Sequence, residues 1–333
     1  MGNIQIGNYI LKHGLFLAPL AGVSDRAFRE VCRAEGAEYT VSEMVSAKAL
    51  CYEQKSRKLL RTAPLASVFT NEMPMAVQLF GSEPEFLAEA AKMIEERSYN
   101  GCISDTPPAA IDINMGCPVH KVVSNGEGSA LMKDPVRAAE IVRAVTRAVK
   151  LPVTVKIRTG WDHESKNAVE MALRLEDAGA SLIAVHGRTR EDMYAPGVDY
   201  ESIARVKESV SVSVVGNGDI YTARDALHML SETGCDGIMV ARGALGNPFL
   251  FAEIRAALEG TEYKSPSWNE RFSTALSQVE RMIEEKGERV AAAEARKHLS
   301  WYIKGMTGAA GARAEINRAE TLEDMKNILK KLI

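Results

Sequence analysis

The segment PVTVKIRTG (Pro152–Gly160) contains the pattern that decides the fold. Branched apolar residues alternate there with polar ones, namely Val153, Val155 and Ile157 with Thr154, Lys156 and Arg158. The alternation predicts a β-strand, because successive side chains of a strand point to opposite faces. In a strand that is covered on both faces, the ammonium of Lys156 must reach the open end of the sheet or be paired.

Similar short apolar runs recur between longer amphipathic segments, as expected of parallel strands joined by crossover helices. The predicted strands are Leu15–Ala21, Tyr39–Met44, Met75–Phe80, Ala110–Asn114, Pro152–Ile157, Ser181–His186, Val212–Gly216 and Gly237–Ala241. Helices are predicted between them, one opening at Ser24 and others over Pro84–Arg97 and Pro135–Val149. A proline in the first helical turn costs no hydrogen bond there.

Eight such strands predict an α/β fold of the (β/α)8 TIM-barrel type, which is typically about 250 residues long. The alternative is a doubly wound open sheet, which usually has fewer strands and a glycine-rich first turn. The first turn here, Pro19–Gly22, contains no GxGxxG motif. We expect the barrel over residues 1–258 and a C-terminal helical domain over residues 268–333, after the linker-like Gly260–Ser267. Its clearest predicted helices are Asn269–Glu285 and Val290–Lys304.

The composition excludes several classes of protein. Of the 333 residues, 46% are hydrophobic, which is enough to form a full core and excludes a disordered chain. The net charge of −3 creates no global cationic field that would attract a polyanion. Five cysteines without a CxxC spacing predict neither a disulfide framework nor a zinc site, and no bound metal is expected. The sequence begins without a signal-peptide pattern and lacks the roughly 18 consecutive apolar residues of a membrane helix, so we expect a cytoplasmic protein without membrane contact.

The last part of the chain is locally basic. Residues 289–333 contain nine Lys or Arg and five Asp or Glu. Such a surface can bind RNA phosphates. An ordinary solvated helical face explains the same charges, so both interpretations stay open.

Polar residues and glycines gather where the predicted strands end, which is where barrel enzymes carry their chemistry. They are Gln78, Asp112, Asn114, Gly116, Cys117, Lys156, Arg158, His186, Arg188, Asn217, Gly218, Asp219, Arg242 and Gly243. Lys156 has three interpretations: a structural ion pair, a cation beside an anionic cofactor, and a Schiff-base lysine, which needs a carbonyl substrate.

Two loops after the seventh and eighth predicted strands indicate a phosphate site. Gly216–Asp219 and Ala241–Gly243 lack bulk, expose backbone N–H groups and add the guanidinium of Arg242. These are the features of the phosphate site of TIM barrels. Tight turns alone also use glycines, but two such turns at adjacent strand ends favour a phosphorylated cofactor or substrate.

Cys117 lies between Gly116 and Pro118 in a stiff turn. A lone cysteine is often a small buried apolar residue, and this position makes a reactive thiol equally compatible. A thiol with a pKa near 8.5 is mostly protonated at neutral pH, so it can act as a general acid. No GxSxG or comparable motif makes it a hydrolytic nucleophile.

Eight motifs, taken together and in order, resemble the tRNA-dihydrouridine synthases and look closest to their bacterial B-type branch. They are LAPLAGVSDRAFR (Leu17–Arg29), AVQLFGSEP (Ala76–Pro84), IDINMGCPVHKV (Ile111–Val122), GEGSALMKDP (Gly126–Pro135), VTVKIRTGW (Val153–Trp161), AVHGRTR (Ala184–Arg190), VVGNGDI (Val214–Ile220) and VARGALGNPFLF (Val240–Phe251). KHLSWYIKG (Lys297–Gly305) also resembles the helical RNA-binding domain of that branch.

The resemblance implies an FMN enzyme that reduces uridine in tRNA to 5,6-dihydrouridine, with NADPH as electron donor. The cofactor-binding residues implied are Pro19, Leu20 and Ala21 under the flavin ring, Gln78, Lys156 and His186 around it, and Asn217, Gly218, Asp219, Ala241 and Arg242 along the ribityl chain and phosphate. Cys117 is the implied catalytic residue, which protonates C5 of the uracil after hydride reaches C6. Asn114 and Arg188 match positions that hold the uracil edge.

Some residues depart from the family pattern. Leu20 replaces a usual methionine and Ala241 a common glycine, Glu127 places an acid near the implied RNA path, and Asn100–Ala109 is longer than usual and expected at the barrel bottom. Three other functions stay as alternatives: modification of ribosomal RNA, reduction of a free pyrimidine, and non-enzymatic RNA binding. No protein partner is implied.

Overall fold

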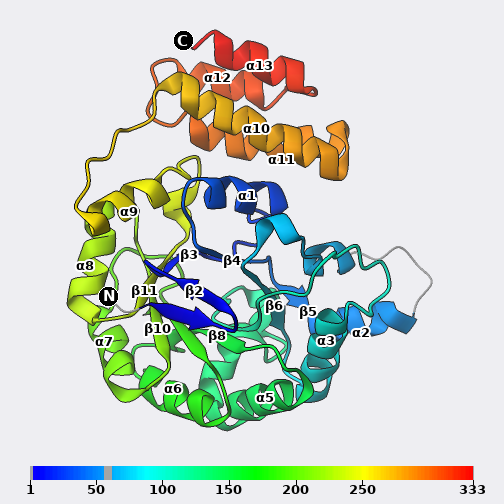
Figure 1. Ribbon diagram of the computed structural model, residues 1–333, viewed down its shortest axis with the longest axis vertical. Coiled ribbons are helices and arrows are strands. Elements are labelled where there is room, and N and C mark those ends of the chain that lie inside the picture. Colours follow the sequence, from blue (N-terminus) through cyan, green and yellow to red (C-terminus); the bar gives the residue numbers. More distant parts are fainter. Residues whose placement is uncertain (1–2, 56–61, 333) are drawn as a thin grey trace.

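The structure, a computed structural model, describes residues 3–55 and 62–332 (Figure 1). Eight parallel strands form a closed ring: β3 (Leu15–Leu17), β4 (Tyr39–Val41), β6 (Met75–Phe80), β7 (Ala110–Met115), β8 (Val153–Gly160), β9 (Leu182–Thr189), β10 (Ser213–Asn217) and β11 (Gly237–Val240). Ile238 of β11 pairs with Leu15 of β3, and this pairing closes the barrel. The predicted TIM barrel is therefore confirmed, and the open sheet is excluded. A short β5 (Val45–Ser46) adds to the end of β6.

The predicted strands correspond to the barrel strands, but some ends differ. β3 stops at Leu17, because Pro19 has no N–H to donate to the ladder and the chain then turns, the Val23 amide donating to the Leu20 carbonyl at 2.9 Å. β8 and β9 run to Gly160 and Thr189, further than predicted. They stay paired there, with a register irregularity between Arg158 and Gly160, so their polar ends are buried within strands.

A hairpin that the sequence pattern does not predict covers one end of the barrel. It consists of β1 (Ile4–Ile6) and β2 (Tyr9–Leu11), which pair antiparallel. Ile4, Ile6 and Leu11 are buried together with Phe16 and Tyr39 of the barrel interior. The hairpin closes the end at which the barrel strands begin and leaves the strand carboxyl ends for the site (Figure 1).

Helices surround the barrel (Figure 1). They are α1 (Arg26–Ala34), α2 (Ala47–Lys55), α3 (Pro84–Glu96), α4 (His120–Val123), α5 (Pro135–Ala148), α6 (Ala168–Asp177), α7 (Tyr200–Ser209), α8 (Ala223–Thr233) and α9 (Leu250–Glu259). α3 and α5 begin at the predicted prolines. α1 begins after Asp25 instead of at Ser24, because the Asp25 carboxylate caps the helix by accepting from the Phe28 amide at 3.0 Å.

The C-terminal part is helical, as predicted. It contains α10 (Trp268–Lys286), α11 (Glu288–Tyr302), α12 (Ala309–Ile316) and α13 (Leu322–Lys330). These helices share an apolar core of their own, to which Ala27 of α1 and Phe249 of the barrel part also contribute. The helical group lies beside α1, at the edge of the barrel (Figure 1).

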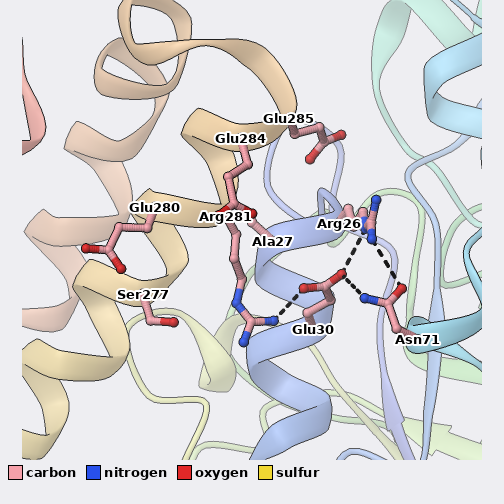
Figure 2. A pocket seen from close by; sticks show the side chains of 9 residues that line it. All are labelled: Arg26, Ala27, Glu30, Asn71, Ser277, Glu280, Arg281, Glu284 and Glu285. Carbon is pink, nitrogen blue, oxygen red and sulfur yellow. Dashed lines mark hydrogen bonds and ion pairs between the residues drawn. The ribbon is translucent and has the colours of Figure 1, made fainter.

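Charged side chains join the helical group to α1. Figure 2 shows Arg281 of α10 bound to Glu30 of α1, which also accepts hydrogen bonds from Arg26 at 2.8 Å and Asn71 at 3.0 Å. Lys286 at the end of α10 adds a second ion pair across this boundary, to Asp25 at 2.6 Å. A polar cavity of about 500 Å³ lies between the two helices.

The segment Asn100–Ala109 packs against residues 62–72. The Asp105 amide donates to the Val68 carbonyl at 3.2 Å, and its carboxylate accepts from the Thr70 amide at 2.7 Å. None of its residues lines the cavity at the strand carboxyl ends. Ile103, 62% exposed, instead lines a cavity of about 700 Å³ shared with α10 and α11.

Candidate active site

A cavity of about 330 Å³ opens at the carboxyl ends of the barrel strands. Most of the residues predicted for the site line it, namely Pro19, Leu20, Ala21, Gln78, Asn114, Cys117, Lys156, His186, Asn217 and Ala241. They come from segments spread over more than two hundred residues of sequence. The barrel brings them together because its parallel strands all end at the same rim.

Lys156 points from β8 into this cavity and binds an amide oxygen. Its Nζ donates to Oδ1 of Asn217 at 3.0 Å, while Nδ2 of Asn217 donates to the Met239 carbonyl at 2.7 Å. Among residues 3–55 and 62–332, Lys156 forms no ion pair, so the interpretation as a structural salt bridge fails. Burial, and then the nearby Arg158, lowers the pKa of Lys156 to about 7.

Cys117 lies on the loop after β7, held by backbone contacts. Its amide donates to Oδ1 of Asn114 at 2.9 Å, and its carbonyl accepts from the Ser129 amide at 3.0 Å. Gly128, at φ +60°, lies so close that an added Cβ would be 2.8 Å from the Cys117 carbonyl oxygen. Burial raises the pKa of the Cys117 thiol, so the group carries its proton at neutral pH. It can therefore act as an acid.

A row of polar side chains lies across the inner face of β6, β7 and β8. Gln78 donates through Nε2 to Oδ2 of Asp112 at 2.7 Å, and Thr154 donates to Oδ1 of the same carboxylate at 2.5 Å. Asn114 donates through Nδ2 to Oε1 of Gln78 at 2.8 Å. These four residues are all buried, so the row is fixed by its own hydrogen bonds.

A second, smaller pocket adjoins the cavity around the loops after β10 and β11. Its lining includes Gly218, Asp219, Arg242 and Arg188. Gly218 and Asp219 have positive φ angles of 141° and 44°, and among the described residues their backbone N–H groups have no hydrogen-bond acceptor. The Arg242 guanidinium beside them pairs with the Asp219 carboxylate at 3.0 Å. Backbone N–H groups that are free to donate, next to a guanidinium, make this pocket suitable for a phosphate.

His186 and Arg188 hold the wall between the two pockets. Nη1 of Arg188 lies 3.1 Å from Nε2 of His186, its Nε donates to the Ala195 carbonyl at 2.6 Å, and its Nη2 is bound to Asp219. Burial, and then Lys156, lowers the pKa of His186 well below its usual value, so the imidazole is neutral and can accept. Arg188 lines the smaller pocket and is not among the residues that line the larger cavity, and its role at the uracil edge stays a prediction.

The cavity also contains residues to which the sequence analysis gave no role. Arg158 donates to the Gly116 carbonyl at 2.7 Å, beside Cys117, and lies 5.8 Å from the centre of the Tyr194 ring. Arg158 is two residues after Lys156 in the strand, so alternation was a signal for it. Tyr194 lies in a loop after β9, and no sequence pattern marks it. Met44 is a further lining residue of this kind.

The sequence of the chain is similar to those of known enzymes over nearly its whole length. A family model described as "Dihydrouridine synthase (Dus)" matches residues 16–333. A "Probable tRNA-dihydrouridine synthase" of Rickettsia conorii is 42% identical and covers 94% of this chain and 91% of its own. A "tRNA-dihydrouridine synthase B" of Pseudomonas aeruginosa is 41% identical (96% and 92%), and one of Vibrio cholerae is 40% identical (98% and 98%).

Solved structures resemble the chain in fold. Histamine dehydrogenase from Rhizobium sp. 4-9 gives a TM-score of 0.56 at 14% identity, covering 89% of this chain and 50% of its own. Morphinone reductase gives 0.51 at 14% identity, covering 80% and 92%. In the described part of the chain, none of the helices has the length and apolar character needed to cross a lipid bilayer.

Proposed function

The chain belongs to the dihydrouridine synthase family and is an oxidoreductase, and we propose that it reduces uridine in tRNA to 5,6-dihydrouridine, with FMN as cofactor and NADPH as electron donor. One observation carries the proposal: the Cys117 thiol and the Lys156 ammonium, far apart in sequence, line the same cavity at the strand carboxyl ends. The first can supply a proton and the second a positive charge.

The residues present fit FMN. The smaller pocket offers the amides of Gly218 and Asp219, which have no acceptor among the described residues, and the Arg242 guanidinium, which the Asp219 carboxylate holds at 3.0 Å. The larger cavity offers the turn Pro19–Ala21 and the Lys156 ammonium for the ring. When bound, FMN supplies the hydride that adds to the uracil. Lys156 forms no ion pair among the described residues, so its ammonium can stabilise negative charge in its neighbourhood; an anion there raises its pKa from about 7 and keeps it protonated.

The remaining chemistry belongs to residues of this chain. The Cys117 thiol is protonated and gives its proton to C5 of the uracil as hydride arrives at C6, so one hydride and one proton together saturate the C5–C6 bond. Arg158, with its guanidinium in the cavity beside the Cys117 loop, favours negative charge on the thiolate left behind. Asn114 fixes the loop through the amide of Cys117.

The substrate must present an unstacked base to this cavity. Leaving the stack costs a few kcal/mol, which phosphate contacts elsewhere on the RNA can offset. We propose that the basic helices over residues 268–333 provide these contacts, and that residues 1–258 bind the cofactor. A reductase of free pyrimidines needs no such helical part.

Mapping of dihydrouridine in total RNA tests the proposed function. A strain that lacks this gene is complemented with the wild type, with Cys117→Ala or with Cys102→Ala; Cys102 is a matched control because it is a half-buried cysteine outside the cavity. We expect specific tRNA uridines to be modified by the wild type and Cys102→Ala, and at least about 100-fold more slowly by Cys117→Ala, because a general acid is lost. Full modification by Cys117→Ala contradicts the assigned role, and modification confined to ribosomal RNA contradicts the assigned substrate.

A further inference from the structure

Asp112 is a buried carboxylate that the proposed reaction does not use directly. It is 4% exposed and is absent from the lining of the active-site cavity. Its two neighbours across the sheet are Gln78 on β6 and Thr154 on β8, which face it in register. Both of its oxygens accept hydrogen bonds, from Gln78 at 2.7 Å and from Thr154 at 2.5 Å.

The two ends of this row set the direction of its hydrogen bonds, because the Asp112 carboxylate only accepts and the backbone amides of Gly116 and Cys117 only donate. An ionised carboxylate only accepts, so Gln78 must turn its NH2 group toward Asp112 and its oxygen toward Asn114. Asn114 must then turn its own NH2 group toward Gln78 and its oxygen toward the loop. That oxygen accepts from the amides of Gly116 at 3.2 Å and Cys117 at 2.9 Å. Burial raises the pKa of Asp112 to about 6, which leaves the group ionised at neutral pH.

We propose that Asp112 is a positioning residue, which orients the amides of Gln78 and Asn114 in series and thereby fixes the backbone of the acid Cys117. The same orientation determines what Gln78 offers to a ligand in the cavity. Its oxygen accepts from Asn114 and one of its N–H groups donates to Asp112, so it presents its second N–H group and the second lone pair of its oxygen. The proposal rests on the proposed function for its catalytic meaning, and on hydrogen bonds alone for its structural content.

Isosteric exchange of the acid and the amide tests this direction. In Gln78→Glu, two carboxylates face each other at the position of the 2.7 Å contact. Such a pair can share a proton, so all variants are compared at a pH high enough to ionise both groups, where their repulsion breaks the row. In the double variant Gln78→Glu with Asp112→Asn, the amide introduced at position 112 donates to the carboxylate introduced at position 78, and its oxygen accepts from Thr154. The introduced carboxylate still accepts from Asn114, so the anchor of Cys117 is restored. Asp112→Asn alone keeps the row, because the Thr154 hydroxyl can reverse and accept.

The readout is the rate at which a small alkylating reagent modifies Cys117, followed by peptide mass spectrometry with Cys102 as internal reference. We expect Gln78→Glu to raise the rate at Cys117 about tenfold, the effect of losing roughly one hydrogen bond, and the double variant and Asp112→Asn to stay within about threefold of wild type. If Gln78→Glu does not fold, recovery of folded protein by the double variant shows the same rescue.

A double variant as disturbed as Gln78→Glu, in alkylation or in folding, overturns the proposal. Unchanged alkylation in Gln78→Glu overturns it as well. A second readout is uridine reduction in a single turnover. It should be retained in Asp112→Asn, and it should recover only in part in the double variant, because the side chain at position 78 then has no N–H to offer to the cavity. Alkylation does not require any activity on RNA, so failure of the proposed function and failure of this proposal are distinguishable.

Discussion

The ammonium of Lys156 is held inside the barrel by an amide oxygen and not by a carboxylate. Burial, and then Arg158, lowers its pKa from 10.5 to about 7. The folded protein therefore binds this proton more weakly than the unfolded chain does. Without a bound anion, this lysine opposes folding wherever the unfolded chain is protonated, which is the cost of placing a cation where an anionic ligand needs it.

Replacing Lys156 by methionine tests this cost. We expect cofactor-free Lys156→Met to be more stable than the wild type by several kcal/mol at pH 7 and below. The difference should shrink as the pH rises from about 7 toward 10.5, because the unfolded wild type then also loses its proton. Urea denaturation of both proteins at pH 6.5 and 9.5 measures this. A difference that does not depend on pH contradicts the prediction, as does full retention of yellow cofactor by the variant during purification.

The location of a single site residue was predictable where it depends only on the position of that residue in a strand. Lys156, Asn217 and Cys117 follow apolar runs, and parallel strands bring such ends together. The hydrogen bond from Gln78 to Asp112 was not predictable, because it depends on the register between β6 and β7, which the sequence does not show. The position of Arg188 was not predictable for the same reason. Its partners Asp219 and Ala195 are brought to it by the tertiary structure, and their hydrogen bonds hold its side chain at the smaller pocket.

At the scale of elements, α1 begins after a residue with two roles. Asp25 caps the helix and also pairs with the C-terminal helices. One oxygen of Asp25 accepts from the Phe28 amide at 3.0 Å, and the other accepts from Lys286 of α10 at 2.6 Å. Helix starts such as Pro84 and Pro135 were predictable from local chemistry. The hairpin β1–β2 was not, because strands of three residues are too short to show a period.

Substitutions of Asp25 separate its cap from its ion pair. Asparagine keeps the capping oxygen and loses the charge, while alanine loses both. We expect Asp25→Ala to be about 1 kcal/mol less stable than Asp25→Asn. Urea denaturation gives the comparison, and Thr222→Ala supplies the reference cost of a lost cap on α8. Equal stability of the two Asp25 variants would show that the cap contributes nothing.

At the scale of the whole molecule, the charges are divided between the two parts. The chain has a net charge of −3, but Arg313 and Arg318 of the helical group are exposed and, within the described chain, form no ion pair. An acidic barrel part limits unspecific contact with nucleic acid, while local cations can bind phosphates. Only the overall division was readable from composition; the arrangement of the helices beside α1 depends on their shared core.

Charge removal from the helical group tests this division. We expect Arg313→Gln with Arg318→Gln to weaken tRNA binding and to reduce the slope of log Kd against log salt concentration by about 0.7 to 0.9 for each RNA phosphate that the variant no longer neutralises. The matched control replaces Lys92 and Arg174, which lie on exposed faces of α3 and α6, by glutamine. An equal reduction of the slope in the control variant contradicts the assigned RNA surface.

The burial of Ala27 among helices near the other end of the chain also bears on biosynthesis. Ala27 of α1 packs with residues of α10 and α11, and Glu30 of the same helix pairs with Arg281. A ribosome releases these partners only after more than two hundred further residues have been translated. Until then the side of α1 that carries Ala27 and Glu30 stays exposed to water on the nascent chain.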